Sequence, residues 1–210
     1  MGLSNLRETA FWIKLERAAD FVLISILWVV LSLPLITLPA VTAGLFAVHT
    51  DWVQGKESEA LLRFFSAIRQ YAWRATLMGF GSILGLGLVA ANLTILPDIG
   101  LPFVLFAFSA GISVFVGGLI LMANLYGWVL LPIFDLPLSN LVKTALQLTF
   151  QHVVWSIAVL LATGIVVLAS LWLLPAGGIV LVLPSGLAWI ISRGSWHVLR
   201  SYEGQILKTQ

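Results

Sequence analysis

The sequence predicts an all-α polytopic membrane protein with about six transmembrane helices in three hairpins, interfacial amphipathic helices, and both termini in the cytoplasm. Three observations predict this fold. Apolar residues make up 60% of the 210 residues, charged residues make up 10%, and the mean hydropathy is +1.04. The apolar residues lie in long runs, and the basic residues lie between those runs. Soluble domains carry about 25% charged residues, so we expect this chain in a bilayer.

Four apolar runs are each long enough to cross a bilayer core of about 30 Å, which takes about 20 helical residues. They cover about residues 75 to 96, 101 to 130, 153 to 174 and 177 to 198. A turn signal, Leu-Leu-Pro-Ala-Gly-Gly at 173–178, separates the last two runs. So short a connection predicts that these two helices are antiparallel neighbours.

The apolar region from Phe21 to Val48 is harder to assign, because it contains Pro34 and Pro39. Drawn as one straight helix it would be about 42 Å long, which exceeds one crossing. Pro39 lacks a backbone donor, and Pro34 restricts Leu33 before it, so a straight helix through both is disfavoured. Three topologies follow: two crossings that turn near the prolines, a re-entrant hairpin that returns to the side it left, and one kinked crossing.

The positions of the basic residues favour the first two topologies. In both of them all eleven Lys and Arg residues fall on one side of the membrane, and Asp98 is the charged residue on the other side. Such segregation is what the positive-inside rule describes for a protein with cytoplasmic termini. A single crossing would divide the basic residues between the two sides. We therefore expect a multi-pass membrane protein with both termini in the cytoplasm, with the depth of the 34–39 corner left open.

Amphipathic stretches precede each of the three hairpins on the expected cytoplasmic side. The first opens with Asn5 three residues before Glu8, a capping-box spacing, and the third has Ser139 or Asn140 as its expected cap. We expect each stretch to lie in the interface and to run into the next span. The single membrane domain, 1–210, is thus predicted to contain interfacial helix 4–19, hairpin 20–54, interfacial helix 58–74, hairpin 75–130, interfacial helix 138–150, hairpin 153–198 and cytoplasmic tail 199–210.

The sequence contains few residues that could carry chemistry. There is no cysteine, which excludes disulfides and thiolate chemistry. His49, His152 and His197 fall in three different elements without a metal-ligand spacing, so we expect no metal and no cofactor. His49 and Asp51 are two residues apart and hence on different helix faces, which argues against an acid/base pair. We expect no catalytic residue, no enzymatic activity and no nucleic-acid partner.

Inside the expected spans the most polar residues are Asn92 and Asn124, and no Asp, Glu, Lys or Arg lies at mid-depth. Ion-coupled carriers usually place at least one ionisable residue there, so its absence argues against a secondary transporter. The asparagines are expected to form hydrogen bonds between helices. Gly81 and Gly85 form a GxxxG pair that is expected to pack helices within the chain.

The segments "LW…SLP", "PAVTAGLFAV", "WVQGKESEALLRFF" and "RATLMGF" together resemble the YesL-like family of small bacterial integral membrane proteins. The resemblance covers about residues 20 to 85. One departure is Ser25, which stands where the family commonly has Asn. The residues that match the family pattern are Trp28, Pro39, Ala40, Ala43, Phe46, Ala47, Val48, Trp52, Gly55, Lys56 and Phe65.

The family has no established activity, and its members are often encoded beside genes for carbohydrate uptake. The resemblance therefore implies a non-catalytic accessory or structural subunit of a bacterial membrane complex, associated with ABC-type carbohydrate import. The alternative is a small permease or channel whose proline-broken first hairpin lines the path. The expected partners are the lipid bilayer and a membrane protein, either a different one or a second copy of the chain. The candidate structural or interaction residues are Trp28, Pro34, Pro39, Ala43, Phe46, Trp52, Gly55, Lys56 and Phe65.

Overall fold

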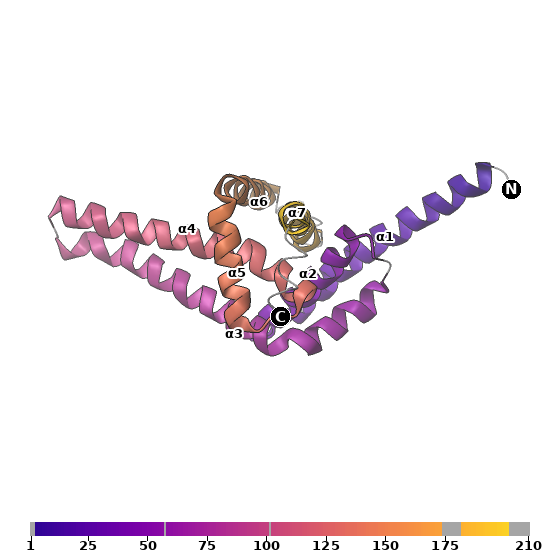
Figure 1. Cartoon of the computed structure of the whole chain (residues 1–210), viewed down its shortest axis with the longest axis horizontal. Coiled ribbons are helices and arrows are strands. Elements are labelled where there is room, and N and C mark those ends of the chain that lie inside the picture. The colour runs from indigo at the N-terminus through magenta and orange to yellow at the C-terminus, as the bar shows by residue number, and fades with distance from the viewer. Residues whose placement is uncertain (1–2, 57, 101, 174–181, 202–210) are drawn as a thin grey trace.

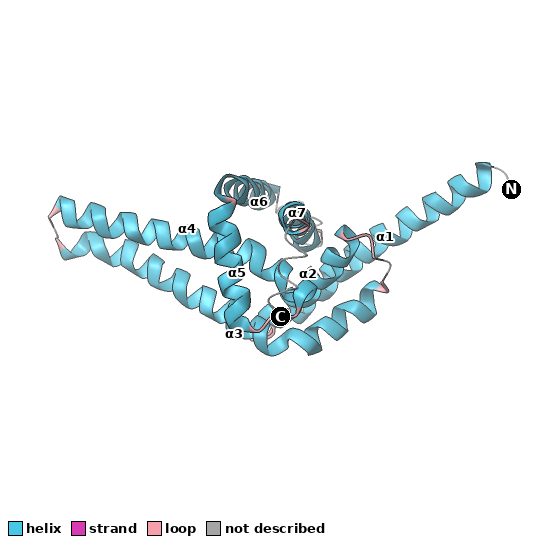
Figure 2. Ribbon diagram, in the orientation of Figure 1, coloured by secondary structure: helices cyan, strands magenta, loops and turns pink. Residues whose placement is uncertain are grey.

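A computed structural model describes the backbone of residues 3–56, 58–100, 102–173 and 182–201, and the side chains of most of them. Within these ranges the chain is helical and contains no strand, which confirms the all-α prediction (Figures 1 and 2). The elements in chain order are α1 (Leu3–Leu31), α2 (Leu38–Val53), α3 (Ala60–Ile95), the 3₁₀ helix η1 (Leu96–Ile99), α4 (Phe103–Phe134), α5 (Leu138–Gln151), α6 (Val153–Leu173) and α7 (Leu183–Leu199).

Three helical segments of the described chain are long and apolar enough to cross a membrane, so the protein is a membrane protein. They are Ala60–Asp98, Phe103–Phe134 and Val153–Ser170. Helices α2 and α7 have 16 and 17 residues, which is shorter than the usual span of about 20. Six crossings and cytoplasmic termini thus stay predictions. The expected turn at 173–178 and the tail at 199–210 lie largely outside the described residues.

Two of the three expected interfacial helices run directly into the following helix, as predicted. Helix α1 contains both the 4–19 stretch and the first arm of the hairpin, and α3 contains both the 58–74 stretch and the next span. No glycine or proline interrupts these junctions, so the backbone hydrogen bonds continue through them. The third stretch forms the separate helix α5, and the non-helical His152 (φ −126°, ψ 43°) divides it from α6.

The expected cap of α5 is wrong. The helix begins at Leu138, directly after Pro137, and no side chain caps it. Ser139 and Asn140 therefore lie inside the first turn. The reason is that Pro137 sits in an extended conformation (φ −61°, ψ 147°) and itself marks the boundary, so the helix starts before either polar residue can act as a cap.

Helix α3 packs against two different helices along its length. Its first half lies antiparallel to α2, with Arg63 paired to Asp51 at one end and Gly79 against Pro39 at the other. Its second half lies against α4 and extends with it as a long hairpin on the left of Figure 1, away from α1 and α2. The first and second hairpins are therefore arranged one after the other along the molecule rather than side by side.

Glycines allow close contact within the α3–α4 hairpin, as the sequence suggested in part. A Cβ atom at Gly85 would lie 2.9 Å from Ile120 Cδ1, and one at Gly117 would lie 3.2 Å from Val89 Cγ1. Gly81, the other member of the GxxxG pair, has no atom within 4 Å of its Cβ position. Packing within the chain thus uses Gly85 but not Gly81.

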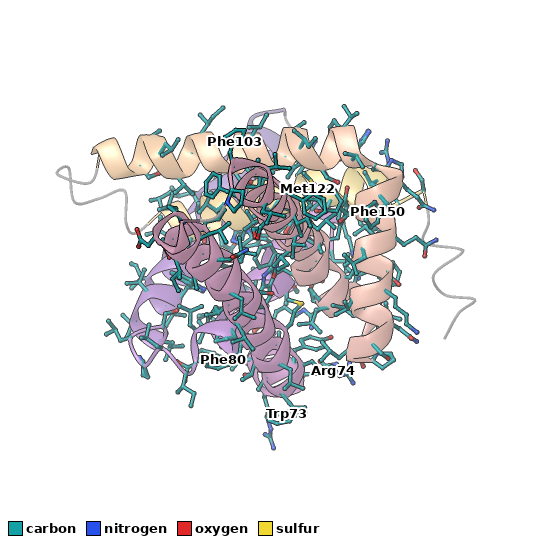
Figure 3. All side chains as sticks on the ribbon, turned by 90° about the vertical axis from the view of Figure 1, so that its left-hand side faces the viewer. Trp73, Arg74, Phe80, Phe103, Met122 and Phe150 are labelled. Atoms are coloured by element: carbon teal, nitrogen blue, oxygen red, sulfur yellow. The ribbon has the colours of Figure 1, made fainter. Side chains whose placement is uncertain are left out.

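Helices α6 and α7 cross the α3–α4 hairpin steeply. They are seen nearly end-on in Figure 1, where α3 and α4 run across the view, and α6 runs across the view in Figure 3. The hydroxyl of Ser185 in α7 donates to the carbonyl of Phe21 in α1, 3.0 Å away, and so joins these two helices.

Small residues along α7 explain this crossing. Ser185, Ala188, Ser192 and Ser195 recur at helical spacing, and each is at most 2% exposed. Because these side chains are short, the α7 backbone can approach α1, α2 and α4 closely. The main-chain amide of Ser185 also donates to Ser25 Oγ at 3.2 Å.

Candidate functional site: the polar junction of α2, α3 and α4

Charged residues tie the end of α2, the first half of α3 and the end of α4 together. Arg63 Nε of α3 donates to Asp51 Oδ2 of α2 at 2.7 Å, and the two side chains are only 21% and 10% exposed. The Arg63 guanidinium also approaches the carbonyl oxygen of Pro132 in α4, at 3.5 Å. A carboxylate this well buried needs a charged or hydrogen-bonding partner, and Arg63 supplies it.

A second ion pair closes the end of α4. Arg74 Nη1 donates to Asp135 Oδ1 at 2.5 Å and to the main-chain oxygens of Asp135 and Leu136 at 3.0 and 3.3 Å. Asp135 ends the helix with a left-handed backbone (φ 47°). The cation stabilises α4 because helix carbonyls near the C-terminus lack intrahelical donors and carry a partial negative charge. We call Asp51, Arg63, Arg74 and Asp135 together the polar junction.

His49 lies next to this junction but does not belong to its hydrogen-bond network. The side chain is fully buried, and neither ring nitrogen has a hydrogen-bond partner among the described residues. The ring packs edge-to-face against Phe21 and Trp52, with centroids 5.4 and 4.9 Å away. His49 thus packs as an aromatic ring, and Asp51 pairs with Arg63 rather than with His49.

Two main-chain hydrogen bonds cap the C-terminus of α2, and Gly55 is the turning residue of this cap. The amide of Gly55 donates to Trp52 O at 3.1 Å, and the amide of Lys56 donates to Asp51 O at 2.9 Å. These two bonds form a Schellman motif, whose turning residue adopts a left-handed backbone. Gly55 has φ 75° and supplies that conformation without steric cost. The exposed side chain of Lys56 makes no described contact.

The other candidate residues fall into a packed group and an exposed group. Trp28 Nε1 donates to Thr42 Oγ1 at 3.1 Å and so joins α1 to α2. Ala43 is fully buried, and Phe46 stacks on Trp128 with centroids 6.1 Å apart. Pro39 is also buried. Pro34 is exposed in the turn, and Phe65 is 50% exposed.

The asparagines of the α3–α4 hairpin bind other helices, which confirms the prediction. Asn92 Nδ2 donates to Ser113 Oγ at 2.6 Å, and Asn124 Nδ2 donates to Ser82 Oγ at 2.9 Å. A cavity of about 400 Å³ opens beside the second pair, between α3, α4 and α5, and its walls are mostly apolar. The polar groups of the hairpin thus satisfy one another.

The sequence reasoning missed the two ion pairs. Asp51 is an isolated acid next to a long apolar segment, and a buried acid of that kind requires a partner. That signal could have identified Asp51 but not Asp135, whose side chain is 55% exposed. It could not have identified Arg63 or Arg74, because those contacts depend on the way α2, α3 and α4 fold onto one another. Within the described residues, no group of three or more acidic or histidine side chains is arranged to hold a metal ion.

Comparison with known proteins shows that part of the chain is similar to one protein family. A family described as "Protein of unknown function, DUF624" matches residues 21–93. This segment runs from the end of α1 through α2 into α3, and it contains the corner, the Schellman motif and three charged residues of α2 and α3 in the junction. No curated protein and no solved structure matches the chain.

Proposed function

We propose that this protein is a YesL-like accessory subunit, without catalytic activity, that assembles with an integral membrane protein of the bacterial cytoplasmic membrane. The family match at residues 21–93 supports this assignment, because it overlaps the segment that resembles the YesL-like family. The partner that the resemblance implies is the permease part of an ABC-type carbohydrate importer.

The exposure of the α3–α4 hairpin carries the proposal. In the most apolar 18-residue stretch of each helix, only 11% of the residues are buried within the chain. Exposed apolar side chains cover the outer faces, among them Leu84 at 66%, Val104 at 74% and Phe108 at 69%. A pair of helices that contacts so little of its own chain leaves a wide surface for other membrane helices.

Helix α4 offers a face that a partner helix could approach closely. Gly111 and Gly118 are seven residues apart, hence on one side of the helix, and neither has an atom within 4 Å of its Cβ position. Association of helices within a membrane depends on close packing, which small residues permit. Gly87 of α3 is equally open and provides a matched control on the neighbouring helix.

The polar junction supports a structural role. Its four charged side chains form two ion pairs, and Arg63 and Arg74 also approach main-chain carbonyls at the end of α4. Such contacts hold the base of the α3–α4 hairpin in a fixed orientation to α2. A pair of apolar helices held in a fixed orientation is suited to binding another membrane protein.

Co-purification in native lipid nanodiscs tests this function. The tagged protein should carry permease subunits of a carbohydrate importer at fixed stoichiometry, identified by mass spectrometry. The double variant Gly111→Leu/Gly118→Leu should lose them, whereas Gly87→Leu should retain them. A monomer without a co-purifying membrane protein would overturn the proposal, as would an assembly of this chain alone. Sugar uptake by the purified protein in liposomes would favour the permease alternative.

A further inference from the structure

We infer that the corner between α1 and α2, which the structure places at residues 32–37 rather than at 34–39, is a lipid-binding tip that enters the near leaflet of the membrane and does not reach its far surface. The near side is here the side of the Arg74–Asp135 pair, and the far side is that of Asp98. The inference concerns the acyl chains of the bilayer as the binding partner. It stands independently of the proposed accessory role.

The rise along helix α3 gives the depth of each contacting residue in the bilayer. From Arg74, held by Asp135, to Ile95 at the helix end, the chain rises about 32 Å at 1.5 Å per residue. This length matches a hydrocarbon core of about 30 Å. Arg74 therefore marks the near boundary, and the 3₁₀ helix that contains Asp98 marks the far boundary.

The corner packs against α3 at a position close to the near boundary of the membrane. Pro39, two residues after the corner, packs against Gly79, where a Cβ atom would lie 2.8 Å from Pro39 Cβ. Gly79 is five residues beyond Arg74, or about 8 Å along the helix, and the remaining rise to Ile95 is about 24 Å. The corner therefore lies within the near half of the bilayer.

Helix α2 is apolar because it is buried in the protein, not because it faces lipid. Twelve of its sixteen residues are buried in the protein, from Pro39 through Asp51 with Thr42 excepted. The helix runs back from Gly79 to Arg63, beside the charged half of α3. A short apolar helix that is buried on all sides is a core helix, so its sequence does not require a crossing.

The corner itself has the chemistry of a surface in contact with lipid. Leu33, Leu35 and Ile36 are 76%, 78% and 71% exposed, and residues 32–37 include no charged side chain. On the adjoining part of α3, Phe80 follows Gly79, which contacts Pro39, and is 44% exposed. Apolar side chains this exposed gain free energy when acyl chains replace water around them.

Internal hydrogen bonds reduce the cost of placing this turn in lipid. The hydroxyl of Thr37 lies 2.5 Å from the carbonyl oxygen of Leu31 and 2.7 Å from that of Pro34. The Thr37 amide also donates to Pro34 O at 2.8 Å. Pro34 has no amide hydrogen to satisfy. A non-helical segment enters the membrane only where its polar backbone groups find partners, and these contacts provide several of them.

Cysteine accessibility tests the inference directly, because the chain has no cysteine of its own. Three full-length variants are compared in intact cells: Ile36→Cys in the corner, Asp98→Cys at the far boundary and Gln70→Cys on the exposed near side. With a membrane-impermeant maleimide added outside the cells, Asp98→Cys should react. Ile36→Cys and the near-side variant Gln70→Cys should both stay at the level of the cysteine-free parent. Reaction of Ile36→Cys from outside would overturn the inference by showing a full crossing.

A spin label on Ile36→Cys then distinguishes lipid from water on the near side. The label should be accessible to oxygen, protected from a water-soluble nickel relaxant, and at a depth within the near half of the bilayer. High accessibility to the nickel relaxant would overturn the inference, because the corner would then lie in water. Leu35→Cys provides the same two readouts if Ile36→Cys does not fold, since both side chains are similarly exposed.

Discussion

Gly79 of α3 lies directly against Pro39 of α2. A Cβ atom at Gly79 would lie 2.8 Å from Pro39 Cβ and 2.9 Å from Pro39 Cγ. The contact sets the register of the first hairpin against α3, since the Asp51–Arg63 pair fixes the other end of the same interface. Together the two contacts place α2 beside the charged half of α3.

We expect Gly79→Ala to destabilise the protein by about 1 to 3 kcal/mol, the usual cost of overpacking a well-packed site. The proline ring is rigid and cannot move aside as a flexible side chain would. Unfolding in mixed micelles, followed by circular dichroism, measures the change. Gly81→Ala is the control on the same helix, because nothing lies within 4 Å of its Cβ position. Equal stability of the two variants would contradict the described contact.

The Asp51–Arg63 pair should contribute more than the Arg74–Asp135 pair. Asp51→Asn is expected to cost about 2 kcal/mol, because it removes a charged hydrogen bond from a side chain that is 10% exposed. Asp135→Asn should cost below about 1 kcal/mol, since that pair is 36% and 55% exposed and water screens it. Double-mutant cycles with Arg63→Gln and Arg74→Gln measure both coupling energies. A larger coupling at Asp135 would reverse this ranking.

Asn92→Val should weaken the α3–α4 hairpin by about 0.6 to 1.7 kcal/mol, which are the average and the maximum measured for such bonds between membrane helices. The variant removes the 2.6 Å bond to Ser113 and the 3.3 Å bond to Ser109. Thr94→Val is the control, because the Thr94 hydroxyl bonds to carbonyls of its own helix. The same unfolding assay applies, and a greater loss at Thr94 would argue against the interhelical role of Asn92.

Gly194→Ala should disturb the contact of α6 with α7, because the added Cβ would lie 2.7 Å from Val159 Cγ2. We expect a loss of about 1 to 3 kcal/mol. Shortening the opposing side chain in Gly194→Ala/Val159→Ala should restore part of it, which thermal unfolding can measure. Gly186→Ala serves as the control at an open position. No recovery in the double variant would show that the two residues do not meet.

Hydropathy and local signals predicted the helical elements well. The interfacial helix expected at 138–150 is Leu138–Gln151, and the asparagines bond between helices as predicted. The prolines of the first hairpin correctly marked the end of α1 at Leu31 and the start of α2 at Leu38. Each of these features depends on neighbouring residues or on the polarity of one position, which the sequence contains directly.

The arrangement of the helices was harder to predict. The segment Pro-Ala-Val-Thr-Ala-Gly-Leu-Phe-Ala-Val has the composition of a lipid-facing helix, yet the protein core buries it. Hydropathy does not distinguish burial in lipid from burial in protein. The Asp51–Arg63 pair depends on the turn at Gly55, and the crossing of α7 depends on which helices meet its small residues. Such relationships arise from contacts between distant parts of the chain.

The position of the α1–α2 corner along α3 can be measured by a disulfide crosslink between Pro39→Cys and Gly79→Cys in the otherwise cysteine-free protein in membranes. We expect the bond to form under mild oxidation, because the two Cβ positions need only separate to about 3.8 Å. A parallel variant pairs Pro39→Cys with Ala91→Cys, about 18 Å further along α3, and should not crosslink. Crosslinking to Ala91→Cys instead of Gly79→Cys would contradict the account, because the corner would then reach the far end of the hairpin.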